Sequence, residues 1–175
     1  MSDVEDQTAR QRDARRRSHV WSLVGGAMLV AQFVLLFLIS RQYVPLLVYL
    51  GFVIWAAGLV LAWLPIFYFP RKAGVAKGRS YVHTTKLVTS GIYSVVRHPQ
   101  YLSFFVLALA LLLIGQHWII VLLGVVGSLA FCLSLRGVDQ WNVEKFGDEY
   151  RRYKDEVPAY NILLGLLRRL RRRRG

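Results

Sequence analysis

Long apolar runs separated by short polar stretches dominate the pattern of this chain. A helix that crosses a bilayer needs about 20 mainly apolar residues. Four runs approach or exceed that length, at residues 21–40, 44–69, 102–114 and 118–135. The third is short, and at about 1.5 Å per residue it crosses only if its helix begins near Pro99 and continues through Gly115. Residues 102–114 could therefore form either a full span or a re-entrant hairpin.

The pattern becomes amphipathic after residue 136. Apolar and aromatic side chains recur there at three- and four-residue steps, which predicts a helix over residues 139–156 that lies against the membrane domain. Gly147 is tolerated inside this helix, and Pro158 ends it. The recurring residues are Val143, Phe146, Tyr150, Tyr153 and Val157.

The last part of the chain combines apolar and basic side chains. Residues 162–175 contain six Ile or Leu residues and six arginines. This combination predicts an interfacial helix on the membrane surface. The alternative is a disordered basic tail with no specific partner.

Composition agrees with the pattern. With 55% hydrophobic residues and a mean hydropathy of +0.37, the chain of 175 residues is too apolar for a soluble domain. We expect an all-α integral membrane protein with about four transmembrane helices, a C-terminal amphipathic helix and a basic interfacial tail. Residues 1–18 are expected to form a disordered basic tail, 19–160 the membrane domain and 161–175 the amphipathic tail, with a loop at 72–80.

The basic residues predict an orientation. Residues 1–18 carry five arginines, residues 70–98 six Lys or Arg, and residues 136–175 eleven, whereas only Arg41 lies elsewhere. Since basic loops stay in the cytoplasm, a multi-pass protein with both termini cytoplasmic is expected. The net charge of +13 then indicates anionic lipids at the basic tail, where each basic group contributes about 1 kcal/mol, and no nucleic acid.

A compact polar cluster stands at the start of the third run. Arg97, His98, Pro99, Gln100 and Tyr101 lead directly into it. Pro suits the first turn of a helix, whose free N–H groups beside an arginine form an anion site.

Two further segments accompany this cluster. Residues 86–93 read Lys-Leu-Val-Thr-Ser-Gly-Ile-Tyr, and residues 146–158 contain Phe-Gly, two tyrosines three residues apart and Val-Pro. In this order the three segments resemble the isoprenylcysteine carboxyl methyltransferase and phospholipid N-methyltransferase family of membrane enzymes. The resemblance implies S-adenosylmethionine as cofactor. It also implies cofactor contacts at Lys86, Leu87, Val88, Tyr93, His98, Pro99, Gln100 and Tyr101.

The chemistry of the cofactor suits these side chains. Arg97 at the helix start could hold its carboxylate, and His98 could donate to it. Tyr93 and Tyr101 could flank the adenine or face the sulfonium, although tyrosines also anchor helices at membrane boundaries.

The part of the sequence expected to bind the methyl acceptor, here called the acceptor half, departs from the family. The resemblance places an arginine at position 134 and a glutamate at position 138, and this chain has Ser134 and Val138 there. Arg136 and Asp139 could substitute as the catalytic pair, because residues three apart on a helix share a face. They could equally form an ion pair without chemistry, and the aromatic residues of 141–153 are then the next candidates.

The resemblance implies methyl transfer to a lipophilic acceptor, either a carboxylate or an amine, that arrives from the bilayer. The alternative is a catalytically silent lipid-binding or assembly module that keeps the fold. The changed positions 134 and 138 favour the alternative, and the intact segment 97–101 opposes it. The four scattered histidines and the single Cys132 give no metal site.

Overall fold

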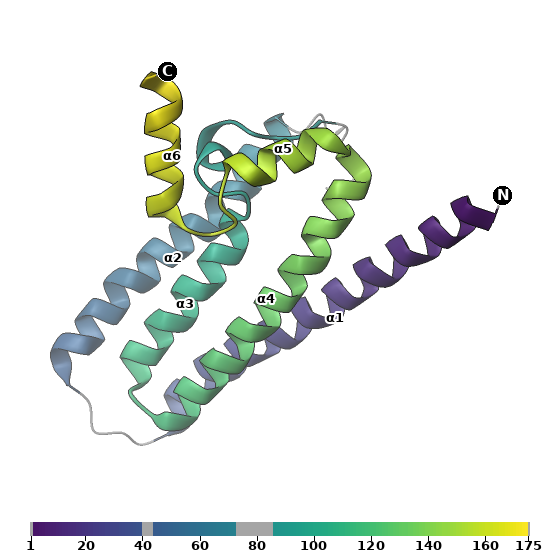
Figure 1. Ribbon diagram of the computed structural model, residues 1–175. Helices are drawn as coiled ribbons and strands as arrows, with labels where there is room; N and C mark the ends of the chain where they lie inside the picture. The colour runs from purple at the N-terminus through teal and green to yellow at the C-terminus, as the bar shows by residue number, and fades with distance from the viewer. Residues whose placement is uncertain (1, 40–43, 73–85, 175) are drawn as a thin grey trace.

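The computed structural model describes residues 2–39, 44–72 and 86–174. Within these ranges every regular element is helical, so the predicted all-α class is confirmed (Figure 1). The helices are α1 (Ser2–Leu38), α2 (Pro45–Lys72), α3 (Pro99–Gly115), α4 (Trp118–Phe146), α5 (Asp148–Glu156) and α6 (Ile162–Arg174), with a short 3₁₀ helix η2 (Gly91–Ser94) before α3.

Three of these helices are long and apolar enough to cross a membrane, namely α1, α2 and α4. Their outward side chains are large and apolar, and Leu23, Phe37 and Leu46 are each more than 70% exposed. The third predicted span, at residues 102–114, corresponds to α3, which has 17 residues and is therefore about 25 Å long. It begins at Pro99 and includes Gly115, which are the limits that a full crossing requires.

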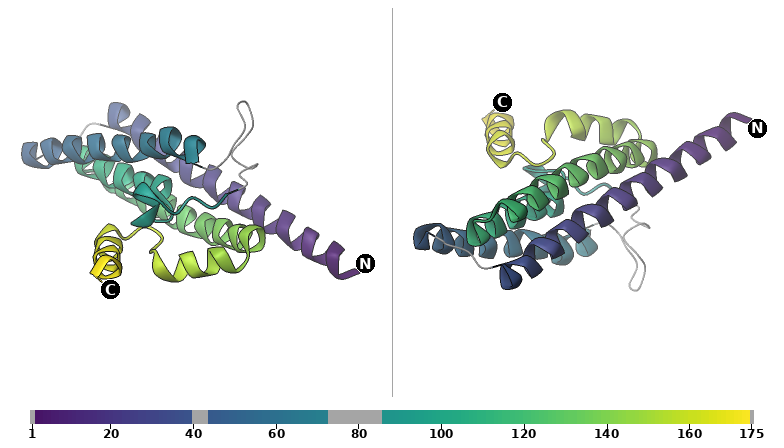
Figure 2. Two further views of the ribbon diagram at one scale, coloured as in Figure 1. Left: turned by 90° about the horizontal axis from the view of Figure 1, so that it is seen from above. Right: turned by 90° about the horizontal axis from the view of Figure 1, so that it is seen from below.

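The long helices pack in two pairs, α1 along α4 and α2 along α3, and the pairs meet each other more sparsely. Figure 2 shows α1 beside α4, with α5 and α6 on the side away from α2. Glycines permit close approach within the pairs: Gly127 faces Met28, and Gly58 faces Leu107. At the end of the bundle where α3 turns into α4, the Gln116 side chain bonds both backbone groups of Val44. This contact ties the turn to the residue before α2.

Two predicted boundaries are wrong. The expected disordered tail over residues 1–18 is helical from Ser2 onward as the first part of α1, whose residues Ala14 and Ser18 lie against Gly137 of α4. The expected single helix over 139–156 is two helices, because Gly147 has φ 58° and ψ −134° and separates α4 from α5. The last span is consequently longer than predicted. The C-terminal helix is confirmed as α6, and most of the loop predicted at 72–80 lies outside the described residues.

Candidate active site

The backbone before α3 is held by the segment that follows α5. The amide of Arg97 donates to the Pro158 carbonyl and the amide of His98 donates to the Ala159 carbonyl, both at 3.0 Å. In the preceding 3₁₀ helix η2, the carbonyl of Tyr93 accepts a hydrogen bond of 2.6 Å from the Tyr153 hydroxyl of α5. Residues 93–98 are therefore positioned by a part of the chain about 60 residues away, and the side chains of Arg97 and His98 reach Asp139 of α4.

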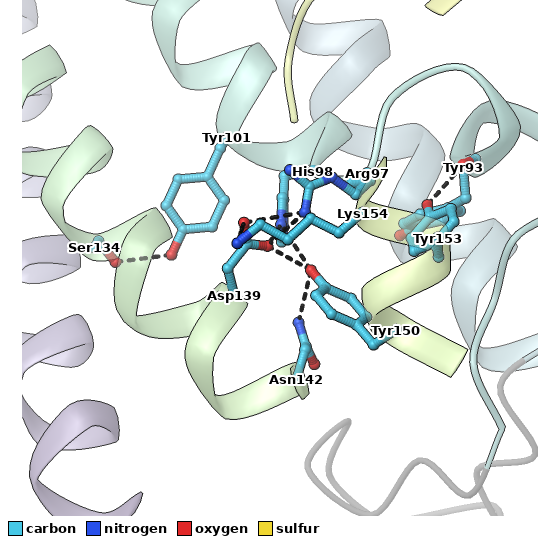
Figure 3. Close-up of polar contacts among 10 residues, drawn as sticks. All are labelled: Tyr93, Arg97, His98, Tyr101, Ser134, Asp139, Asn142, Tyr150, Tyr153 and Lys154. Carbon is cyan, nitrogen blue, oxygen red and sulfur yellow. Dashed lines mark hydrogen bonds and ion pairs between the residues drawn. The ribbon is translucent and has the colours of Figure 1, made fainter. Parts of the chain in front are cut away.

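Asp139 of α4 is the centre of the polar contacts (Figure 3). Arg97 Nη1 lies 3.0 Å from both carboxylate oxygens, and His98 Nε2 lies 2.8 Å from Oδ1. The Tyr150 hydroxyl donates to the same Oδ1, and Lys154 Nζ lies 3.8 Å from Oδ2. The side chains of Asp139, Arg97 and His98 are only 12%, 7% and 9% exposed. A buried carboxylate with this many cationic and hydroxyl donors is stable as the anion.

Tyr150 stays protonated in this environment. Burial, and then the negative charge of Asp139, raise the pKa of Tyr150 above its ordinary value. Burial, followed by the neighbouring Tyr150, likewise raises the pKa of Tyr153. Both hydroxyls can therefore act as donors, one to Asp139 and the other to the Tyr93 carbonyl.

A cavity of about 290 Å³ lies beside this cluster. Its size is near the lower end of the range for small-molecule sites, and its walls combine aromatic rings with charged and hydrogen-bonding groups, as such sites do. All nine residues expected to contact a cofactor line it: Lys86, Leu87, Val88, Tyr93, Arg97, His98, Pro99, Gln100 and Tyr101. The remaining lining residues are Val138, Trp141, Asn142, Phe146, Tyr150 and Tyr153.

One polar atom of a residue that lines the cavity lacks a hydrogen-bond partner in the described part of the chain. Nε of Arg97 is buried and has no hydrogen-bond partner among the described residues. A buried unsatisfied donor costs about 1–3 kcal/mol, and more on a charged group. Because Arg97 also lines the cavity, an acceptor bound there could satisfy this donor.

A chain of hydroxyl groups connects the cavity with α1. The Tyr101 hydroxyl lies 2.8 Å from Ser134 Oγ, which lies 2.6 Å from Ser22 Oγ. Ser134 also donates to the Ser18 carbonyl at 2.8 Å. Ser134, which stands where the family resemblance places an arginine, therefore fixes Tyr101 to α1 and α4. Val138, at the position of the family glutamate, forms part of the cavity wall.

The two residues expected to form a catalytic pair are separated. Asp139 points toward Arg97 and His98. Arg136 is exposed and lines a second cavity between α1 and α4, together with Arg17 and Trp21. Residues three apart on a helix generally share a face. Here, however, Asp139 pairs with the buried Arg97 of the loop before α3 and not with Arg136.

Tyr150, Asn142 and Lys154 complete the cluster. Asn142 and Lys154 were not predicted as site residues, and Tyr150 was included only among the aromatic alternatives of 141–153. Asn142 Nδ2 donates to the Tyr150 hydroxyl at 3.4 Å. The three- and four-residue spacing that contains Tyr150 indicated a packing helix, and the same spacing turns its hydroxyl toward Asp139. Only the break at Gly147, which bends α5 back over the loop, brings these groups together.

Fold and cavity together define a helical membrane protein with a polar, partly aromatic cavity at one end of its bundle. Comparison with known proteins shows which family part of this chain resembles. The sequence model of the isoprenylcysteine carboxyl methyltransferase (ICMT) family matches residues 76–138, so the resemblance to this family is confirmed over the part of the chain that contains the first two motifs.

A curated relative agrees with this result. Over 101 residues the chain is 34% identical to the protein-S-isoprenylcysteine O-methyltransferase of Schizosaccharomyces pombe. The match covers 53% of this chain and 43% of that relative, so this chain spans less than half of the relative's length. No solved structure matches the chain.

Proposed function

We propose that this chain is an S-adenosylmethionine-dependent methyltransferase that acts on a lipophilic acceptor at the cytoplasmic face of a membrane. The observation that carries the proposal is the convergence of all nine motif residues on one cavity beside a buried carboxylate. These residues come from the loop before α3 and from its first turn. The cavity lies at the end of the bundle that the basic loops predict to be cytoplasmic.

The lining groups suit the proposed cofactor. Arg97, with its unsatisfied Nε at the start of α3, offers a cation and a donor to the amino-acid carboxylate. Tyr93, Trp141 and Phe146 offer aromatic faces to the adenine or to the positive sulfonium. When bound, the cofactor supplies an electrophilic methyl group. The protein then has to align the acceptor with it and exclude water.

The acceptor is proposed to be a carboxylate on a lipophilic molecule, and the relative's name points to an isoprenylated cysteine. Lys154, which is 47% exposed and 3.8 Å from Asp139, is a cation that could turn toward such a carboxylate. An amine acceptor would instead have to lose a proton. The His98–Asp139 contact at 2.8 Å supplies a base of that kind.

The catalytically silent module stays a second candidate. Nη1 of Arg97 is already paired with Asp139. The positions of the family arginine and glutamate hold Ser134 and Val138, which carry no charge. A module of this kind would bind the cofactor or a lipid and transfer nothing.

The test is to measure cofactor binding and methyl transfer separately on protein reconstituted in lipid nanodiscs. Arg97→Ala should weaken S-adenosylmethionine binding by about 1.5–3 kcal/mol, because a charge-assisted contact is lost. Methyl transfer to an isoprenylated cysteine, followed with radiolabelled cofactor, distinguishes the enzyme from the silent module. Unchanged affinity in both Arg97→Ala and His98→Ala would refute the cofactor site.

Arg136→Ala decides between the two arrangements of the acceptor half. Loss of transfer with intact cofactor affinity would support the pair predicted from the sequence, since an orienting contact acts on reaction geometry. Full activity would assign the acceptor to the cluster around Asp139. Arg12→Ala, which removes an exposed arginine from α1, is the matched control.

A further inference from the structure

α6 presents an apolar stripe that the described part of the chain leaves uncovered. Successive residues of an α-helix are about 100° apart, so Leu163, Leu166, Leu167 and Leu170 share one face. Their exposed fractions are 75%, 43%, 60% and 55%. Exposed apolar patches on this scale mark a surface that binds something.

The opposite face of α6 is fixed to the protein. Gly165 lies against Val95 so closely that an added Cβ would overlap the Val95 carbonyl group. Nη1 of Arg168, one turn further on, donates to the Asp155 carbonyl near the end of α5 at 2.8 Å. The amide of Leu164 donates to the side chain of Asn161 at 3.0 Å, which caps the helix start. The direction of the stripe is therefore set by the fold.

Arginines flank the stripe. By the same geometry Arg169 and Arg171 lie on its two sides, and no acidic residue occurs in residues 162–175. Long basic side chains beside an apolar stripe can reach lipid headgroups while the leucines enter the acyl boundary. Charge complementarity therefore favours an anionic bilayer surface over a protein groove as the occupant.

The segment before α6 connects this surface with the candidate active site. Pro158 and Ala159 bind the amides of Arg97 and His98, and Asn161 caps α6 only two residues later. Gly165 contacts the same loop at Val95. Any contact that immobilises α6 must therefore also restrain residues 95–98.

We propose that α6 docks on an anionic lipid surface and thereby holds the backbone of Arg97 and His98 in place. Docking of α6 restrains the end of residues 158–161. The hydrogen bonds of Pro158 and Ala159 to the amides of Arg97 and His98 transmit this restraint to the loop before α3. The effect needs no bound cofactor. It can be measured whether or not the methyltransferase proposal holds.

Docking is tested with an environment-sensitive dye on Leu167→Cys, in a Cys132→Ser background and in nanodiscs of phosphatidylcholine with or without phosphatidylserine. We expect the dye to enter an apolar environment when phosphatidylserine is present, and less so at high salt. Removing two charges with Arg169→Gln and Arg171→Gln should reduce docking about thirtyfold. A dye that stays in water in both bilayers, or enters both equally, would overturn the proposal; the first result would point to a protein partner.

The matched control removes two exposed arginines from α1, with Arg12→Gln and Arg15→Gln. This end of α1 lies far from α6 (Figure 1), so docking should not change. Equal loss of docking in the control would show a nonspecific charge effect and would contradict the role of α6.

The restraint is tested by hydrogen exchange of the Arg97 and His98 amides in the same two nanodiscs. We expect slower exchange with phosphatidylserine. Gly165→Ala should retain dye insertion and lose the lipid dependence of exchange, because the added methyl group separates α6 from Val95. Exchange that does not respond to phosphatidylserine while α6 docks would refute the restraint.

Discussion

The cluster around Asp139 allows a quantitative prediction. Replacing Asp139 by alanine removes the acceptor of Arg97, His98 and Tyr150 in one step. The Arg97 guanidinium is then left buried, with a side chain only 7% exposed. Breaking a buried ion pair by removing one partner costs about 3–5 kcal/mol, and we expect a loss of this size in the free energy of unfolding.

Two further variants separate charge from shape. Asp139→Asn keeps an oxygen acceptor and loses the charge, so about 1.5–3 kcal/mol should be lost. Replacing both partners by apolar residues, as Arg97→Met with Asp139→Leu, should cost less than Asp139→Ala alone, because no unpaired charge stays buried.

The assay is reversible unfolding in mixed micelles, analysed as a double-mutant cycle for Arg97 and Asp139. Strong coupling between the two replacements is expected. Strictly additive losses, or a loss below about 1 kcal/mol for Asp139→Ala, would show that the pair is solvated and would refute this account of the site.

Three other predictions concern topology, the helix break and pH. With Cys132→Ser as background, a cysteine at Trp118 should react with an impermeant thiol reagent outside cells, and one at Thr89 should not; the reverse would invert the orientation. Gly147→Ala should cost about 1–3 kcal/mol in unfolding free energy because φ is 58° there, whereas Gly26→Ala, with no neighbour within 4 Å, should cost nothing; equal effects would contradict the strain. The pKa of Tyr150 is raised on folding, so its contribution is complete below pH 10 and is lost as pH rises toward the folded pKa. Stability should thus fall by about 1.4 kcal/mol per pH unit above pH 10, and Tyr150→Phe should remove that increment from the pH dependence of unfolding.

The sequence predicted the helices well and their junctions poorly. Apolar runs identify spans because each helix satisfies its own backbone in the bilayer. The packing of residues 14–18 of α1 and the break at Gly147 involve tertiary contacts, since Ser18 packs on α4 and Tyr153 of α5 bonds the loop before α3. Neither contact leaves a periodic signal.

The candidate site shows the same division. The residues now found around one cavity were identifiable as contiguous motifs, and their role in cofactor binding stays a prediction. The partners of Asp139 were not identifiable, because Arg97 lies 42 residues before it in the chain. Helix periodicity alone suggested Arg136 as the partner. Periodicity gives the face of a residue and not which neighbouring element covers that face.

The backbone hydrogen bonds from Arg97 and His98 to Pro158 and Ala159 have a consequence for biosynthesis. All the long helices precede Pro158 in the chain, so the ribosome delivers them to the membrane before the carbonyls that fix the loop have been made. Insertion and maturation of the site are therefore separate events. A nascent chain interrupted after α4 would occupy the bilayer with its helices paired while the loop before α3 still lacks its anchor. Quality control that monitors insertion alone would not detect such a product.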